Sequence, residues 1–485
     1  MRESPLHPGH EPAAVTRAPL RQVILASTAL LLLAGAVMAG PLSLRPRRGV
    51  DSITHALAQG PHAGECDQCH TTHGDDLTSP YPNALQGPDD NALCLRCHDT
   101  PWKGGSFAND PLYRASGHGS STAMLWPGPD PPARIEPDAA TKCLNCHDAH
   151  GQSDAAGPIA QLTLQREEGL CLQCHDGSPA ATNIQNELNK PYRHPVTTYS
   201  GRHTGPLESL PTDFGTTPVS QRHSECEDCH DPHTSRADPL TGVRDDDASQ
   251  TTLGVSRVAV LNGVAGAPPS YQFIAGSDTL SAPNSEYQLC FKCHSSWTSQ
   301  PSGQTDLALA LNPANPSYHP VEAPGRDAGI DPNSFANGWT RGQVTRCGSC
   351  HGSDFGSVQG PHGSTYPAIL RAPYSASSTP RDMSSNELCF SCHAFAVYGD
   401  PTSSAATRGA SRFNAPGVTS GHAEHVGQQH VPCYVCHITH GSTTLPHLLV
   451  AGRTPGVNEI LFSPTGGSCT PSCHAAKDWT ANYAR

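Results

Sequence analysis

Aromatic side chains are scarce in this chain of 485 residues, where Phe, Trp and Tyr together make up only 6 %. The chain instead has 45 glycines and 46 prolines, which interrupt helices and strands. This composition excludes long regular helices and a large conventional core. On its own it is typical of an irregular chain, so the fold needs something other than side chains to pack around.

Long apolar runs are almost as scarce. The clearest covers residues 23–39, follows Arg17 and Arg21, and ends in Val37-Met38-Ala39, which is a small-residue cleavage site. We predict a signal peptide over residues 1–39. A retained N-terminal membrane anchor through residues 23–39 is the alternative, because the run is just long enough to span a bilayer. In both cases we expect the rest of the chain to be exported, to the periplasm or to the outer cell surface.

Positive charge is also in deficit, since the formal net charge is −13. A surface of this sign argues against binding to nucleic acid. It favours partner proteins that present a basic docking patch.

Cysteine, by contrast, is abundant and ordered: all 20 cysteines belong to ten paired motifs, each followed directly by a histidine. Nine of the motifs read Cys-x-x-Cys-His, and the tenth has three residues between its cysteines. The motifs are Cys66/Cys69/His70, Cys94/Cys97/His98, Cys143/Cys146/His147, Cys171/Cys174/His175, Cys226/Cys229/His230, Cys290/Cys293/His294, Cys347/Cys350/His351, Cys389/Cys392/His393, Cys433/Cys436/His437 and Cys469/Cys473/His474.

This spacing is that of covalent haem attachment. Two thiols a short loop apart form thioethers with one porphyrin, and the histidine that follows binds its iron from below. A zinc site, a thioredoxin-like redox motif or a disulfide does not require a histidine directly after the second cysteine. The sequence therefore predicts ten covalently attached haem c groups, with a bare pair or a disulfide as the alternative at the wider tenth motif.

The ten motifs form five successive pairs, which we call units 1 to 5. In each unit one histidine precedes the first motif, and another comes after it, usually in a Cys-His-x-x-His pattern. Unit 3 also contains an insert at residues 237–285 that has neither Cys nor His. Two strand-like runs in the insert, residues 255–261 and 271–275, predict a β-hairpin.

A six-coordinate haem needs a second axial ligand, and methionine can supply almost none of them. Of the four methionines only Met124 and Met383 lie outside the predicted leader. Histidine is ample, with 28 in the chain. We therefore predict that the two recurring histidines of each unit are the distal ligands, which gives bis-histidine haems.

The predicted distal ligands form two sets. The leading histidines, which precede the first motif of each unit, are His62, His118, His194, His319 and His425, with His55 as the alternative to His62 and His422 as the alternative to His425. The following histidines, which come after the first motif, are His73, His150, His233, His362 and His440. His203, His223, His430 and His447 are left as surface or propionate-binding residues.

The predicted fold is a multihaem cytochrome c with little secondary structure, in which loops, short α-helices and a small β-hairpin insert surround a core of haems. We expect an N-terminal four-haem lobe over residues 40–190 and a C-terminal six-haem lobe over residues 191–485.

The chain resembles the doubled-CXXCH multihaem c-type cytochromes. The resemblance rests on Gly-Glu-Cys66-Asp-Gln-Cys-His70-Thr-Thr-His73-Gly, Leu-Cys290-Phe-Lys-Cys-His294-Ser-Ser-Trp, Tyr318-His319-Pro-Val and Cys433-Tyr-Val-Cys-His437-Ile-Thr-His440-Gly-Ser. It implies electron transport in the periplasm or toward extracellular acceptors, with other cytochromes or membrane electron-transfer complexes as partners.

Bis-histidine ligation predicts low reduction potentials and saturated irons, so we expect a non-catalytic electron carrier with no catalytic residues. The alternatives are a multihaem reductase of nitrogen or sulfur oxyanions, whose open iron would be the one at His474, and a subunit of an extracellular cytochrome filament, which is a homopolymer.

Overall fold

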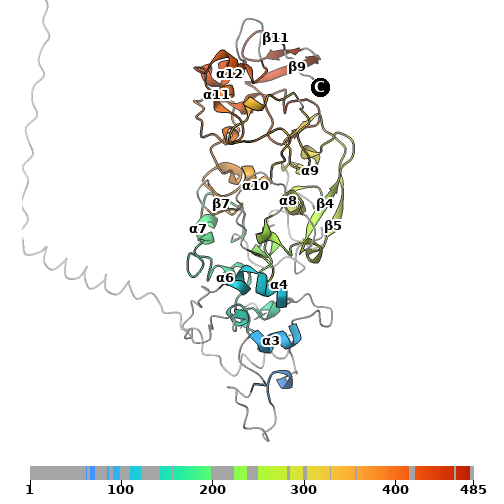
Figure 1. The fold of residues 1–485 in the computed structure, drawn as a ribbon, viewed down its shortest axis with the longest axis vertical. Helices are drawn as coiled ribbons and strands as arrows, with labels where there is room; N and C mark the ends of the chain where they lie inside the picture. The colour runs from blue at the N-terminus through green and yellow to red at the C-terminus, as the bar shows by residue number, and fades with distance from the viewer. Residues whose placement is uncertain are drawn as a thin grey trace, which may run out of the picture.

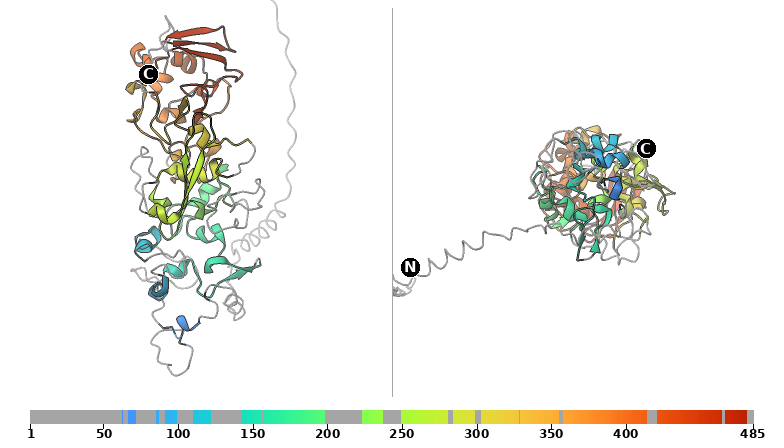
Figure 2. Two further views of the ribbon diagram at one scale, coloured as in Figure 1. Left: turned by 90° about the vertical axis from the view of Figure 1, so that its right-hand side faces the viewer. Right: turned by 90° about the horizontal axis from the view of Figure 1, so that it is seen from below.

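The computed structural model describes residues 62, 66–71, 85–86, 91–98, 110–121, 142–155, 157–197, 223–236, 249–280, 284–298, 303–327, 329–354, 358–413, 421–463 and 466–480. The predicted leader, His55, His73 and His203 lie outside these residues. The described part of the chain is elongated, and its segments follow one another along the long axis roughly in sequence order (Figure 1). The side view in Figure 2 has the same order, from the N-terminal units at one end to the C-terminal sheet at the other.

The helices in the described ranges are short, as the glycine and proline content predicts, and the longest of them has 9 residues. The α-helices are α3 (Asn91–His98), α4 (Asp110–Ala115), α5 (Gly117–Ser120), α6 (Glu167–Cys171), α7 (Ile184–Leu188), α8 (Glu286–His294), α9 (Leu307–Leu311), α10 (Cys347–Cys350), α11 (Phe395–Tyr398) and α12 (Ala405–Gly409). The 3₁₀ helices are η1 (Cys66–Gln68), η4 (Lys142–Asn145), η5 (Ala160–Leu162), η7 (Cys226–Asp228), η8 (Gln250–Thr252), η9 (Gly276–Leu280), η10 (Pro332–Ser334), η11 (Pro367–Ile369), η12 (Leu388–Ser391) and η14 (Cys433–Val435), and η13 (Ala423–Gln428) is a π-helix.

The strands form small antiparallel sheets. They are β1 (Ser153–Asp154), β2 (Gly157–Pro158), β3 (Tyr192–Arg193), β4 (Arg257–Leu261), β5 (Ser270–Ile274), β6 (Ser317–Tyr318), β7 (Gly363–Ser364), β8 (Gly441–Ser442), β9 (Val457–Ser463), β10 (Gly466–Pro471) and β11 (Lys477–Thr480). The pairs are β1–β2, β3–β7, β4–β5 and β6–β8, and the three-stranded sheet has the order β11-β10-β9. The predicted low content of secondary structure is therefore confirmed.

The hairpin predicted in the insert of unit 3 is present as β4 and β5, with Val258 opposite Phe273. It packs on α8, which begins with a capping box between Ser285 and Gln288. Together with α9 these elements bury a small apolar cluster of Val258, Phe291, Ala308, Leu311 and Val321. Phe291 lies inside the sixth motif, so the insert is built around a haem-attachment site.

The sheet β9-β10-β11 was not predicted, because its sequence shows no clear alternation of apolar and polar residues. Trp479 on β11 is buried against it and lies opposite Gly467 of β10. A Cβ atom on Gly467 would lie 2.5 Å from the Trp479 ring, which explains the glycine there.

No helix in the described ranges is long and apolar enough to cross a membrane. The division into lobes at residue 190 stays a prediction. Backbone contacts do cross that position, since the Gly117 N–H donates to the Ser235 carbonyl over 2.8 Å.

Candidate functional site

Most of the Cys-x-x-Cys-His motifs form a closed turn. In seven of them the histidine N–H donates to the carbonyl of the first cysteine, four residues earlier, over 2.8–3.0 Å; the histidines are His70, His147, His175, His230, His351, His393 and His437. In α3 and α8 the motif completes a longer helix. The turn brings both thiols and the imidazole to one side of the backbone, as attachment of one porphyrin requires.

The exposure of the attachment cysteines varies along the chain. Cys66, Cys97, Cys293, Cys350 and Cys473 are exposed, and the others are half-buried. The Cys97 thiol lies near the first motif, because its charge is among the causes that raise the pKa of Cys69, after burial and Cys94. The assignment of these cysteines to haem attachment stays a prediction.

The tenth motif is built differently. Cys469 lies on strand β10, where it is paired with Ile460 and Lys477. The extra residue of this motif comes where the strand ends, and His474 and Cys473 are both exposed. Only its geometry departs from the other nine motifs, since it still presents two thiols and one imidazole.

In units 2 to 5, the histidine of the first motif has its Nδ1 fixed by a backbone carbonyl. His147, His230, His351 and His437 bond in this way to Gln161, Thr251, Ala368 and His447, over 2.8–3.1 Å. With Nδ1 occupied, Nε2 is the nitrogen left to bind a metal.

These carbonyls lie on a turn that recurs after the first motif. In units 2, 4 and 5 the turn contains two successive residues with positive φ, and its next residue bridges back to the motif histidine, as His351 does with Leu370. Gln161-Leu162, Ala368-Ile369 and His447-Leu448 are the left-handed pairs. This turn was not predicted from the sequence.

Nine of the ten motif imidazoles face a second imidazole from outside the motifs. The pairs are His70–His150, His98–His62, His147–His233, His175–His118, His230–His362, His294–His194, His351–His440, His437–His422 and His474–His425, with ring centroids 5.9–6.2 Å apart. Two imidazoles that bind one metal ion from opposite sides through bonds of about 2 Å have centroids about 6 Å apart. The spacing therefore fits one iron between each pair.

The remaining motif imidazole, His393, is buried among Phe335, Tyr398 and His319. Its ring centroid is 6.1 Å from that of Phe335 and 5.5 Å from that of Tyr398. Burial and then His319 are the strongest causes that lower the pKa of His393, to about 4. The charge of His319 thus acts on His393, and His319 stays the predicted distal ligand at this motif.

The pairs follow one rule. A leading histidine pairs with the second motif of its own unit, as His194 does with His294. A following histidine pairs with the first motif of the preceding unit, as His362 of unit 4 does with His230 of unit 3. Both sets of histidines were predicted from the sequence, but the pairing of a following histidine with a motif of the preceding unit was not.

A second regularity links the two sets. The Nδ1 of a leading histidine bonds to the carbonyl of the residue just before the following histidine of the next unit. His62, His118, His194 and His319 bond in this way to Ala149, Pro232, Pro361 and Thr439, with 3.4, 3.0 and 2.7 Å for the first three. The segment around each following histidine therefore supplies its own imidazole to one motif. Through a backbone carbonyl it also holds the imidazole of a leading histidine in the preceding unit.

Paired strands hold these segments in register. β3, directly before His194, pairs with β7, directly after His362, and β6 pairs in the same way with β8. The contact is close, because a Cβ atom on Gly363 would lie 1.9 Å from the Glu187 carbonyl oxygen and one on Gly441 would lie 1.8 Å from that of Ala310. Only glycine permits this approach.

Unit 5 is self-contained. Its first motif pairs with His422 and its second with His425, and the two histidines flank the first turn of the π-helix η13. The wider turn of a π-helix is common at functional sites. Phe413 contacts both rings, with centroids 5.2 Å from His422 and 6.1 Å from His425. His422 and His425 were predicted as alternatives for one position, and the structure gives each its own motif.

Burial favours the uncharged form of several of the paired imidazoles. It lowers the pKa of His294, His362, His437 and His440 to about 4 and that of His422 to about 3, and neighbouring histidines lower them further. A neutral imidazole is the form that binds a metal ion.

The thiols show the order of the ten motifs in space. At the junctions between units, burial and a shared hydrogen bond between two first cysteines raise the pKa of one thiol; the pairs are Cys94–Cys143, Cys171–Cys226, Cys290–Cys347 and Cys389–Cys433. Within a unit, a second-cysteine thiol of the first motif lies near the thiols of the second motif, as Cys146 does to Cys171 and Cys174. The same holds for Cys69–Cys94, Cys229–Cys290, Cys350–Cys392 and Cys436–Cys469. Every motif is therefore next to its neighbours in the sequence.

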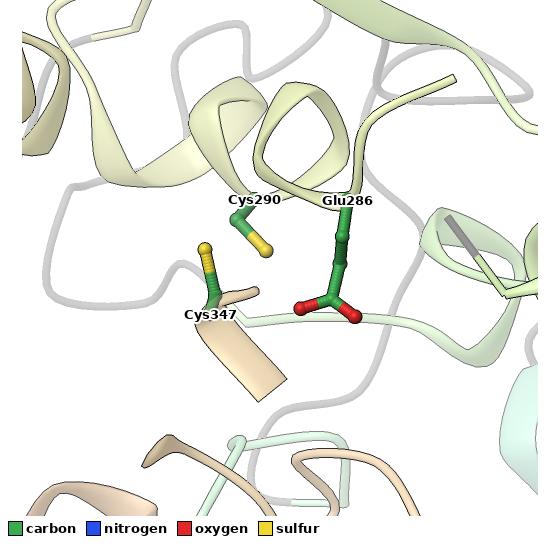
Figure 3. Close-up of side chains that lie close together, drawn as sticks. All are labelled: Glu286, Cys290 and Cys347. Atoms are coloured by element: carbon green, nitrogen blue, oxygen red, sulfur yellow. The ribbon is translucent and has the colours of Figure 1, made fainter. Parts of the chain in front are cut away.

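One junction has the composition of a metal site, with Glu286, Cys290 and Cys347 grouped within 4.8 Å (Figure 3). Both thiols belong to haem-attachment motifs, and the Glu286 carboxylate already accepts the Gly348 N–H over 2.6 Å. The group is the meeting point of the sixth and seventh motifs on α8 and α10.

Three of the four histidines left unassigned in the sequence are described, and each faces a carboxylate. The Nδ1 of His430 lies 2.7 Å from Asp382 Oδ1, and the Nδ1 of His447 lies 3.1 Å from Asp327 Oδ2. The Nε2 of His223 lies 3.8 Å from Glu225 Oε1.

Repeated Cys-x-x-Cys-His turns with a facing imidazole are typical of the multihaem c-type cytochromes, in which haem c is covalently attached. The family model for the doubled CXXCH motif matches residues 60–101, 136–180 and 340–397, which hold both motifs of units 1, 2 and 4. The resemblance noted from the sequence is thereby confirmed. The unmatched units are unit 3, with its long insert, and unit 5, with its wider tenth motif. Neither the search of curated proteins nor that of solved structures found a match.

Proposed function

We propose that the chain is a decahaem c-type cytochrome that carries electrons and has no catalytic site. The observation that carries this proposal is that nine of the ten motif imidazoles face a second imidazole, with ring centroids 5.9–6.2 Å apart. An iron held between the two imidazoles of such a pair would have no position open to a substrate. Bound haem supplies reversible one-electron chemistry at its iron.

The protein's own residues hold and tune each site. Carbonyls fix Nδ1 of proximal histidines such as His230 and of distal ones such as His194, so that Nε2 faces the iron. Two histidine ligands stabilise ferric iron more than a histidine and a methionine do, which favours low potentials.

The sequential contacts between thiols support a single file of haems in the order of the motifs. In that file electrons would travel along the long axis, between the first motif at Cys66 and the tenth at Cys469. Both cysteines are in end units of the described chain (Figure 1). Partners would then dock near the two ends.

We further propose that the protein is exported and acts in the periplasm or at the outer cell surface. The apolar run over residues 23–39 and the chemistry of c-type haem attachment support this location. The formal net charge of −13 favours redox partners with basic docking patches.

Low-temperature EPR of the oxidised holoprotein, scored against its haem content, tests the proposal. We expect ten haems for each chain and only low-spin ferric signals. A stoichiometric high-spin haem would contradict saturation and would favour a reductase. Its position could be checked first at His474, the exposed histidine of the tenth motif.

A further inference from the structure

The insert of unit 3 brings an unusual cation into the interior. Arg257, the first residue of β4, is 0 % exposed. Its Nη2 donates to the carbonyl and to the hydroxyl oxygen of Thr252, each over 2.8 Å. Its Nε and Nη1 are buried and have no hydrogen-bond partner. A buried guanidinium with two unused donors is costly unless an anion completes it.

The place where this cation lies is the junction of the fifth and sixth motifs. Its charge acts on the thiols of Cys229 and Cys290, which belong to these motifs. Next to it, the Nζ of Lys292 donates to the Asp228 carbonyl over 2.9 Å and to the Ser256 hydroxyl over 3.3 Å. The cations Arg257 and Lys292 thus lie where the insert meets the fifth and sixth motifs.

The carboxylates nearby are engaged elsewhere. Asp228 accepts the Glu225 N–H over 2.7 Å, and Glu286 accepts the Gly348 N–H. Neither carboxylate is bonded to Nε or Nη1 of Arg257.

Haem attachment adds two new carboxylates at each site, the porphyrin propionates. We propose that Arg257 binds a propionate of the haem at the fifth or the sixth site through an N–H group that has no partner within the chain. This inference rests on the proposed function, because it requires haem at these motifs. A guanidinium N–H forms a strong, charge-assisted hydrogen bond to a carboxylate.

The pairing has a redox consequence. Reduction adds an electron to the haem, and a cation nearby stabilises the reduced form. Arg257 therefore raises the potential of its haem relative to the same site without the cation. The insert is then a tuning device in the middle of the file.

The test compares three variants of the holoprotein by spectroelectrochemical titration. Arg257→Gln removes the charge and keeps hydrogen-bond donors. We expect one haem of the ten to become harder to reduce, so that its ratio of reduced to oxidised form at a fixed potential falls about tenfold, which is about 59 mV for one electron. Arg257→Lys should shift the same haem in the same direction by a smaller amount. Arg326→Gln is the matched control, because Arg326 is exposed and bonds only to carbonyls of Ala314 and Asn315. It should leave the curve unchanged.

Haem content and circular dichroism separate the possible failures. An Arg257→Gln protein that is folded and fully loaded, with a titration curve identical to that of the wild type, would overturn the inference. If that variant does not fold, Arg257→Lys decides, and a curve superimposable on the wild type overturns the inference. A wild-type chain without haem at the fifth and sixth sites would instead refute the proposed function.

Discussion

The junction between units 4 and 5 and the interior of unit 5 complete their haem sites in opposite ways. At the junction, unit 5 sends His440 to the first motif of unit 4, and the same segment fixes His319 through the Thr439 carbonyl. Within unit 5, the π-helix η13 presents His422 and His425 to the unit's own motifs. In the first arrangement, ligation of the site requires the two units to pack together. In the second, the ligands come from within the same unit.

The largest effect is expected where a crossing histidine is removed. His440→Ala should leave the iron at His351 without a distal ligand and leave a cavity beside β8. We expect one high-spin ferric haem of ten and a loss of about 2–5 kcal/mol of stability at the junction. EPR and thermal unfolding of the holoprotein measure the two effects. His430→Ala is the control, since His430 is an exposed histidine bonded to Asp382. A fully low-spin His440→Ala protein would show that the pairing is wrong.

Removal of the local ligand should produce the same spectrum with less structural damage. His422→Ala should turn the iron at His437 high-spin, while the β6–β8 pairing and the site at His351 stay intact. Limited proteolysis can compare the two variants. We expect the segment between units 4 and 5 to become more accessible in His440→Ala than in His422→Ala. Equal accessibility would remove the distinction between crossing and local ligation.

A third change tests the packing without touching a ligand. Gly441→Ala would place a Cβ atom 1.8 Å from the Ala310 carbonyl oxygen, so β8 must move away from β6. We expect a loss of about 1–3 kcal/mol and broader low-spin EPR signals, because His440 and His319 both lie beside these strands. Gly342→Ala, where the added atom meets nothing within 4 Å, should be near neutral. The comparison fails if both substitutions have the same effect.

The smallest effect concerns pH on the unit 4 side of the junction. Burial raises the pKa of Glu322, three residues after His319, from 4.5 to about 7, while Asn262 donates to its carboxylate over 2.5 Å. Between pH 4.5 and 7 the folded state holds a proton that the unfolded state has lost. The stability that this proton contributes is full below pH 4.5 and disappears as the pH rises through 7.

Glu322→Gln should therefore flatten the pH dependence of stability between pH 4.5 and 7 and raise stability above pH 7 by about 1–3 kcal/mol. Thermal unfolding over this range measures it. A Glu322→Gln protein that keeps the wild-type slope would show that the carboxyl is ionised in the folded state.

The sequence predicted what depends on covalent spacing and local repetition. The attachment residues follow from the motifs alone, and the leading and following histidines were visible because their contexts recur, as in His194-Pro-Val and His319-Pro-Val. The hairpin of the insert was visible from its two apolar runs. Each of these signals lies within one short stretch of chain.

The partner of each histidine was not visible, because it depends on which segments meet in space. The reach of His362 to the preceding unit is set by the β3–β7 pairing, which involves strands of only two residues. His422 was undervalued because one histidine was expected at each position, whereas the π-helix presents two. A histidine pair three residues apart was the available signal.

The burial of each attachment cysteine was not visible either. Cys97 and Cys293 are exposed, although their motifs have the same spacing as those of half-buried cysteines. The motif therefore does not determine how far each thiol is covered by the rest of the chain.

The crossing of ligands also sets an order in time. A chain is synthesised from its N-terminus, so on the proposed ligation the site at His230 would stay incomplete until His362 of the next unit has been made. The first site of each of units 1 to 4 would therefore be completed only after the next unit has been made, whereas unit 5 carries its own His422. We expect the sites to mature in sequence order, each one after the synthesis of the following unit.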